Sequence, residues 1–117
     1  AALGCAQMEV LPKYLEQKRQ LAMQYQEFFN CGDLQFVQEP EYGRSNYWLN
    51  AVICPDKASR DLLLKATNDV GVMTRPIWKL MHRLPMFESA LRGDLSVSEW
   101  LEGHLVNVPS SPIELAR

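Results

Sequence analysis

The residues best able to do chemistry in this sequence fall in one stretch, from Thr74 to Phe87. Three cations, a histidine and a tryptophan lie close together there: Arg75, Trp78, Lys79, His82 and Arg83. Guanidinium and ammonium groups bind phosphate, an imidazole exchanges a proton near neutral pH, and an indole presents a flat face for stacking. The stretch is therefore predicted to contact a ligand that combines phosphate with a planar base or a sugar.

Each of these residues also has a simpler structural interpretation. A single tryptophan such as Trp78 often packs in a core, and a single histidine such as His82 is often held by structural hydrogen bonds. The prediction of a binding loop rests on the clustering of these residues after a strand, because such loops often carry function. Farther along, Glu99 and Glu102 are expected to form a solvated helix face.

The sequence lacks the motifs of a self-contained catalytic site. It has no glycine-rich phosphate loop, no GxSxG elbow, no HExxH helix and no close carboxylate pair with an evident task. Cys5, Cys31 and Cys54 are widely spaced, without a histidine at the spacing of a zinc ligand, which predicts three reduced and mostly buried thiols. Neither a catalytic residue nor a metal ligand is predicted within this chain.

The composition predicts one folded domain without a nucleic-acid or membrane partner. Of 117 residues, 47% are hydrophobic and 22% are charged, which is typical of a globular chain with one core. The net charge of -2 gives no basic excess for nucleic acid, and no apolar run is long enough to span a bilayer. We therefore expect a cytoplasmic protein. The chain opens at Ala1 without an initiator Met, which indicates a cut end.

The first quarter of the chain is predicted to be helical. Apolar residues recur at helical spacings and define one face: Leu3, Val10, Tyr14, Leu21, Tyr25 and Phe28. Pro12 lies inside this pattern, so either one helix is kinked there or a second helix begins there. Asn30, Cys31 and Gly32 are expected to end the helix, with Gly32 able to take the left-handed conformation. Strands are then expected over 34–37 and 46–53, joined as a hairpin.

The second half predicts two more helices and two more strands. A helix over 57–70 is expected to end at Gly71, and the proline of a strand over 72–76 either ends that strand or restricts it to a sheet edge. A helix over 96–102 begins with a Ser-Val-Ser-Glu capping box, and a last strand covers 105–108. These elements predict an α+β fold, with helices packed on a short, mostly antiparallel sheet.

Five short motifs follow one another along nearly the whole chain, at 1–8, 18–25, 45–49, 71–76 and 81–87. They read AALGCAQM, KRQLAMQY, SNYWL, GVMTRP and MHRLPMF. In this order they make the chain resemble the C-terminal part of the DegT/DnrJ/EryC1/StrS sugar aminotransferases. The resemblance implies that residues 1–117 form the small C-terminal domain of a fold type I enzyme, whose N-terminal cofactor-binding domain lies outside this chain.

The resemblance also implies a reaction for the parent enzyme. Members use pyridoxal 5'-phosphate, bound by a lysine of the large domain, to move an amino group from an amino acid, usually glutamate, to a keto sugar linked to a nucleotide. They are homodimers in cell-surface or amino-sugar biosynthesis. The ending at 107–111 is similar to members that aminate a UDP-linked 4-keto-6-deoxy sugar on the way to legionaminic acid or bacillosamine-type sugars.

Four residues are assigned to the substrate side by this resemblance, namely His82 with Arg75, Trp78 and Lys79 as neighbours. Arg75, Lys79 or His82 is expected to compensate the charge of the pyrophosphate, and Trp78 to shape the apolar wall. No lysine of this chain lies in a context resembling the cofactor-binding lysine, so the chain alone is expected to bind no cofactor and to be inactive.

Two alternatives stay open. One is a dehydratase of the same family, which uses the same cofactor but has histidine in place of the lysine. The other is a module without catalytic activity that binds a nucleotide or another protein through residues 75–87.

Overall fold

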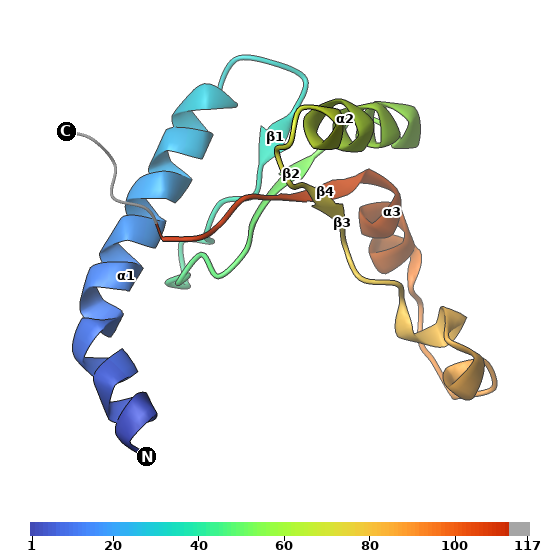
Figure 1. The fold of residues 1–117 in the computed structure, drawn as a ribbon. Coiled ribbons are helices and arrows are strands. Elements are labelled where there is room, and N and C mark those ends of the chain that lie inside the picture. Colours follow the sequence, from blue (N-terminus) through green and yellow to red (C-terminus); the bar gives the residue numbers. More distant parts are fainter. Residues whose placement is uncertain (113–117) are drawn as a thin grey trace.

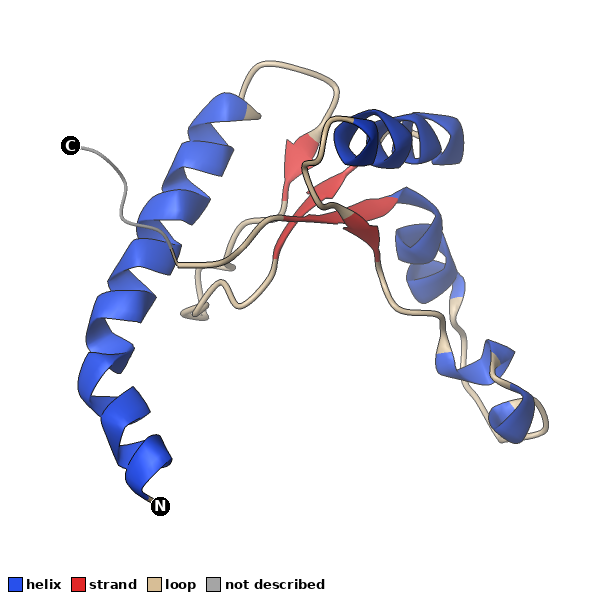
Figure 2. Ribbon diagram, in the orientation of Figure 1, coloured by secondary structure: helices blue, strands red, loops and turns tan. Residues whose placement is uncertain are grey.

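The computed structural model describes residues 1–112, which form three α-helices and a four-stranded antiparallel sheet (Figures 1 and 2). The helices are α1 (Ala2–Phe28), α2 (Lys57–Asp69) and α3 (Ser96–His104). The strands are β1 (Gln35–Phe36), β2 (Asn50–Ile53), β3 (Arg75–Pro76) and β4 (Leu105–Val108). Two 3-10 turns, Met81–Arg83 and Pro85–Phe87, lie between β3 and α3. The predicted α+β class is confirmed.

The sheet places β4, the last strand, between β2 and β3, in the order β1-β2-β4-β3. All three pairings are antiparallel, and Asn107 of β4 lies opposite Ala51 on one side and Arg75 on the other. The edge position predicted for the strand that contains Pro76 is confirmed, because proline has no N–H to donate to a second neighbour.

A small core lies between one face of the sheet and the helices α1 and α2. Its buried members are Ala22, Phe36, Val52, Cys54 and Val106, with Leu63 and Leu64 of α2 packed against them. Val52 and Val106 face each other across β2 and β4, and both are fully buried. Burying such a side chain contributes about 1.5–3 kcal/mol, so this central pair anchors the domain.

Helix α1 is one continuous helix with Pro12 inside it, which settles the alternative that the sequence left open. The predicted apolar face is only partly correct, since Leu21 and Ala22 are buried whereas Leu3 is 76% exposed. The reason is visible in Figure 1, where the N-terminal half of α1 extends past the sheet and meets no other element. No helix among residues 1–112 is long and apolar enough to cross a membrane.

Helix α1 ends just before the stop predicted at residues 30–32, but without the left-handed glycine. The helix ends at Phe28, and the N–H of its cap, Phe29, bonds to the Tyr25 carbonyl. Gly32 does not take the left-handed conformation, which among the described glycines occurs only at Gly71, with φ of 82°. The glycine predicted to close α2 is thus confirmed.

The predicted hairpin exists, but its strands are shorter than expected. β1 and β2 pair antiparallel, yet β2 begins at Asn50 because the preceding residues hydrogen-bond to side chains of α1 instead of to a strand.

The prediction that the three cysteines are mostly buried was wrong. Only Cys54 is buried, whereas Cys5 and Cys31 are exposed. Both exposed thiols lie outside the small core.

The capping box predicted for α3 does not form. The helix begins after Leu95, which makes no side-chain cap bond. Ser96 instead bonds back to Asp94, whose carboxylate accepts from both the Ser96 N–H and its hydroxyl. Ser96 therefore hydrogen-bonds to Asp94 and does not cap the helix, and these two bonds fix the backbone at the start of α3.

Candidate functional site

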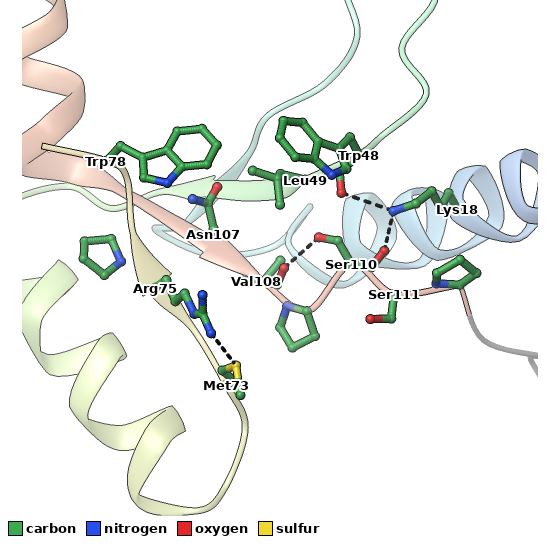
Figure 3. A pocket seen from close by; sticks show the side chains of 13 residues that line it. Lys18, Trp48, Leu49, Met73, Arg75, Trp78, Asn107, Val108, Ser110 and Ser111 are labelled. Carbon is green, nitrogen blue, oxygen red and sulfur yellow. Dashed lines mark hydrogen bonds between the residues drawn. The ribbon is translucent and has the colours of Figure 1, made fainter. Parts of the chain in front are cut away.

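A groove of about 900 Å³ opens beside the sheet, bounded by the residues before β2, the edge strand β3 and the segment that follows β4 (Figure 3). Side chains alternate between the two faces of a strand, and Val106 points into the core. Its neighbour Asn107 and the opposite Arg75 therefore project from the face that the core helices leave open. A volume of this size is ordinary for a small-molecule site.

Two tryptophans form one wall of the groove. The ring centroids of Trp48 and Trp78 are 6.1 Å apart, with 38° between the ring planes. Their exposed fractions are 64% and 71%, so the core position considered for Trp78 is wrong. Two large indoles exposed side by side are uncommon on a solvated surface, which makes this wall a candidate contact surface.

Lys18 of α1 fixes two walls of the groove. Its Nζ donates to the carbonyl oxygens of Tyr47, Trp48 and Ser110, at 3.3, 3.1 and 2.6 Å. Burial lowers the pKa of Lys18. Because these carbonyls lie before β2 and after β4, one ammonium group joins the segment that presents Trp48 to the segment that follows β4.

The segment after β4 is held in two further ways. The Tyr25 hydroxyl donates to the Pro109 carbonyl at 3.0 Å. The Ser110 hydroxyl accepts from the Asn50 N–H at 2.7 Å and donates to the Val108 carbonyl at 2.8 Å. These bonds extend the β2–β4 pairing beyond the last strand residue and make this wall well defined.

A second network positions the residues that precede Trp48. Arg19 of α1 forms a two-pronged salt bridge with Glu39, with N···O distances of 2.6 and 3.1 Å, and also donates to the Ser45 carbonyl. The hydrogen bonds from Arg19 and from the Ser45 N–H lower the pKa of Glu39 to about 2. The Arg19 guanidinium also lies 5.6 Å from the centre of the Tyr47 ring.

Tyr47 adopts φ of 48°, a left-handed conformation that few residues with a side chain take. Its N–H is satisfied by the Ser45 hydroxyl, and the Trp48 N–H by the Asn46 side chain. The backbone conformation that turns Trp48 toward the groove is therefore enforced by local bonds and by the Arg19–Glu39 pair.

Three polar side chains of the groove, those of Arg75, Asn107 and Ser111, have few protein partners. The recorded contact of the Arg75 guanidinium is with the Met73 sulfur, at 3.2 Å, and no carboxylate among residues 1–112 pairs with it. No hydrogen bond involves the side chains of Asn107 or Ser111 within the described part of the chain. A cation, an amide and a hydroxyl thus face the groove with capacity to bind a ligand.

The predicted site residues divide between two places. Arg75 and Trp78 line the groove, whereas Lys79 is exposed and does not line it. His82 lies in the 3-10 turn, with its Nε2 3.2 Å from Glu99 Oε1 and its side chain only 16% exposed. In Figure 1 this turn lies beyond α3, away from the sheet. The structure therefore does not bring all four residues together.

Two carboxylates of α3 hold the His82 turn in place. Besides the His82–Glu99 pair, Arg83 pairs with Glu102 and lies 3.7 Å from Glu99. The predicted solvated face is wrong for Glu102, whose side chain is only 19% exposed. These carboxylates act as ties between α3 and the turn rather than as a free acidic surface.

Several residues of the groove were not predicted from the sequence: Lys18, Trp48, Asn107, Ser110 and Ser111. They come from three segments that are far apart along the chain, so no local motif joins them. Trp48 carried the strongest available signal, because it is a second tryptophan next to a strand. The pairing of β4 with both β2 and β3, which brings these segments together, is a long-range feature.

The four-stranded sheet and its helical cover form a small α+β fold that solved aminotransferase structures share. The chain matches the DegT/DnrJ/EryC1/StrS aminotransferase family over residues 1–114, and it belongs to this family. The resemblance inferred from the five motifs is confirmed.

Two curated relatives illustrate the match. EpsN of Bacillus subtilis, named as a pyridoxal phosphate-dependent aminotransferase, is 30% identical over 78% of this chain and 24% of its own length. GDP-perosamine synthase of Escherichia coli O157:H7 is 27% identical over 96% of this chain and 30% of its own length. The chain thus spans about a quarter to a third of the curated relatives it matches.

Solved structures share the fold. The aminotransferase TlmJ of Streptoalloteichus hindustanus superposes with a TM-score of 0.83 at 22% identity, over 93% of this chain and 29% of that chain. The E. coli GDP-4-keto-6-deoxy-D-mannose-3-dehydratase, solved with hydrated PLP, gives a TM-score of 0.79 at 24% identity, over 97% and 31%. At these identities the likeness concerns the fold.

Proposed function

We propose that residues 1–117 are the small C-terminal domain of a pyridoxal-phosphate-dependent aminotransferase. The parent enzyme moves an amino group from an amino acid, glutamate, to a keto sugar carried on a nucleotide, in the biosynthesis of cell-surface amino sugars. The observation that carries this proposal is the family match over residues 1–114. The name of the relative GDP-perosamine synthase supports a nucleotide-linked sugar as the substrate.

The cofactor-binding lysine is proposed to lie outside this chain. Lys18, the lysine that lines the groove, donates to three backbone carbonyls, so its nitrogen is engaged as an ammonium donor and is a poor nucleophile. Lys18 therefore does not fit a covalent cofactor site. When bound by the parent enzyme, the cofactor supplies the electron sink for amino transfer.

The residues of this chain are proposed to bind and orient the nucleotide sugar. Arg75, which has no carboxylate partner among residues 1–112, suits the pyrophosphate, and Trp78 supplies a flat apolar wall. His82 is oriented by Glu99, which leaves its other ring nitrogen for a substrate oxygen. The exposed Lys79 follows Trp78 directly along the chain and adds a positive charge next to it.

The shape of the chain supports a place within a larger body. Its radius of gyration is 16.9 Å, whereas a compact domain of this length is expected near about 13 Å. Two parts of the chain extend away from the sheet, the N-terminal half of α1 and the two 3-10 turns. Both carry exposed apolar side chains, including Met8 on α1 and Met86 in the second 3-10 turn. A large N-terminal domain, and a second subunit of a cytoplasmic homodimer, would cover such surfaces.

A dehydratase of the same family is the second candidate. The curated relative GDP-4-keto-6-deoxy-D-mannose 3-dehydratase of Yersinia pseudotuberculosis, 26% identical over 98% of this chain and 31% of its own length, favours keeping it. The two enzymes differ at the cofactor-binding position, lysine in one and histidine in the other, so reading that residue in the complete gene separates them.

The test uses the complete gene product, purified and supplied with pyridoxal phosphate, glutamate and a nucleotide-linked 4-keto-6-deoxy sugar. Mass spectrometry should detect the amino sugar, and 2-oxoglutarate should form in equal amount. Formation of a 3-deoxy keto sugar would assign the dehydratase instead. As the matched control, the 117-residue chain alone should form no product and no adduct reducible by borohydride.

A further inference from the structure

Helix α2 has two apolar faces, and only one of them packs on the core. Leu63 and Leu64 contact the core residues beneath the helix. Leu62, Ala66 and Val70 form the other face, which we call the α2 stripe, and their spacing of four residues places them in one row. Leu62 is 68% exposed and Val70 is 75% exposed, and no element among residues 1–112 covers them. In Figure 1, α2 lies at the edge of the molecule, away from α1.

Two opposite charges flank the α2 stripe. Lys65 and Asp69 lie one turn apart beside it and form a salt bridge with each other. Both side chains are mostly exposed, so both are accessible to a partner. Single exposed apolar residues are ordinary on a protein surface, whereas an aligned row bordered by polar groups is typical of an interaction surface. The α2 stripe therefore suits a partner that carries an apolar row together with both charges.

We propose that the α2 stripe binds the α2 stripe of a second copy of this chain, with the two helices antiparallel about a twofold axis level with Thr67. Because the helix rises about 1.5 Å per residue, Lys65 and Asp69 each lie about 3 Å along the helix from this axis. Lys65 of each copy is then level with Asp69 of the other. An axis level with Ala66 would leave Lys65 as far from Lys65 of the second copy as from its Asp69, so the charges select the axis at Thr67.

The apolar side chains fit the same axis. Val70 lies about 4.5 Å along the helix from it, midway between the levels of Ala66 and Leu62 of the second copy, at about 1.5 and 7.5 Å. Val70 of each copy therefore inserts between these two residues of the other, as side-chain ridges of one helix pack into the grooves of another. A twofold contact must be self-complementary, and one axis satisfies this condition for both the charges and the packing.

The expected association is weak. A row of three side chains and one pair of charges buries far less than the roughly 1,600 Å² of a standard interface, and exposed salt bridges set the register more than the affinity. The contact involves neither the groove nor the exposed parts of α1 and the 3-10 turns, so it is separate from the homodimer interface proposed above. It goes beyond the proposed reaction and does not depend on it. In the complete protein it would join homodimers into tetramers.

Sedimentation velocity of the 117-residue chain, from about 10 µM to about 1 mM, tests this inference, with circular dichroism as the check of folding. The expected dissociation constant for the pair is on the order of 0.1 mM. Leu62→Lys should raise it by at least about tenfold, because a charged group then lies in the apolar row. The matched control is Met23→Lys on α1, where a side chain of similar exposure, 67%, lies outside the stripe, and it should change nothing.

Charge variants test the register. Lys65→Asp and Asp69→Lys each place like charges level with each other across the axis, so each should raise the dissociation constant about threefold or more. The two substitutions together exchange the signs on both helices and should restore the wild-type value. Melting curves separate this effect from a structural one, because the salt bridge between these residues on one exposed helix contributes little to stability.

Three outcomes would overturn the inference. One is a chain that stays monomeric over the whole concentration range while folded. Another is association that Leu62→Lys leaves unchanged, because a different surface then carries it. The third applies if the chain does not fold by itself, and is a complete gene product of the same mass in solution with and without Leu62→Lys. Amino transfer by that protein would still support the proposed function, so the failures of the two proposals are distinguishable.

Discussion

Replacing Lys18 with methionine should destabilise the domain, because one ammonium group joins two segments that are far apart in sequence. Methionine keeps much of the aliphatic stem but removes the donor to the carbonyls of Tyr47, Trp48 and Ser110. Hydrogen bonds to a charged group contribute about 1.5–3 kcal/mol each when buried. Water can replace part of this bonding, since Lys18 is only half-buried, so we expect a net loss of about 2–3 kcal/mol in the free energy of unfolding.

Urea denaturation followed by circular dichroism measures this loss directly. A change of this size lowers the melting temperature by roughly 10 °C for a domain of this length. The matched control is Lys57→Met on the exposed start of α2, which should stay within about 0.5 kcal/mol of wild type. Acrylamide should also quench Trp48 more efficiently in the Lys18 variant. An equal and small effect of both substitutions would refute the role given to Lys18.

Three further predictions concern acid stability, substrate binding and packing. The pKa of Glu39 is depressed by Arg19, so its stabilising effect is complete above about pH 4.5, the ordinary range of a glutamate, and is lost as the pH falls toward 2. In acid denaturation monitored by circular dichroism, the free energy of unfolding of Glu39→Gln should depend less on pH in this range than that of the wild type. An unchanged pH dependence would contradict the prediction. In the complete enzyme, His82→Ala should raise the KM for the nucleotide sugar by about tenfold or more and that for glutamate much less. Equal changes in the KM values for the nucleotide sugar and for glutamate would show that His82 has a structural role instead. Val106→Ala should cost about 2–3 kcal/mol in urea denaturation, because it leaves a cavity at the centre of the sheet, and a loss below 1 kcal/mol would contradict that packing.

Much of the fold could be predicted from local patterns. Periodicity predicted the helix over 57–70 and the last strand, and the conformational freedom of glycine predicted the end of that helix at Gly71. The structure contains all three, with small changes at the ends of the elements. The apolar face of α1 was overestimated because periodicity reports only that a face is apolar. Periodicity does not show whether another segment of the same chain packs against that face. Leu3 is exposed, so among the described residues nothing covers it.

The site was harder to predict because its residues meet through the sheet. Arg75 and Trp78 stand in one local cluster and were found, but Asn107 joins them only because β4 pairs with β3. Lys18 lies outside the apolar face predicted for α1, and its contacts with residues 29, 30 and 92 positions away leave no local trace in the sequence. His82 was grouped with Arg75 by proximity in sequence, whereas Glu99 holds it on the other side of α3.

We propose that this chain belongs to an enzyme that aminates a nucleotide-linked keto sugar. The most direct test incubates the complete gene product with nitrogen-15-labelled glutamate, pyridoxal phosphate and a UDP-linked 4-keto-6-deoxy sugar, and follows the label by mass spectrometry. The label is expected to appear in the nucleotide sugar. Label that stays in glutamate while the cofactor is bound and the keto sugar is left unchanged or deoxygenated would contradict it.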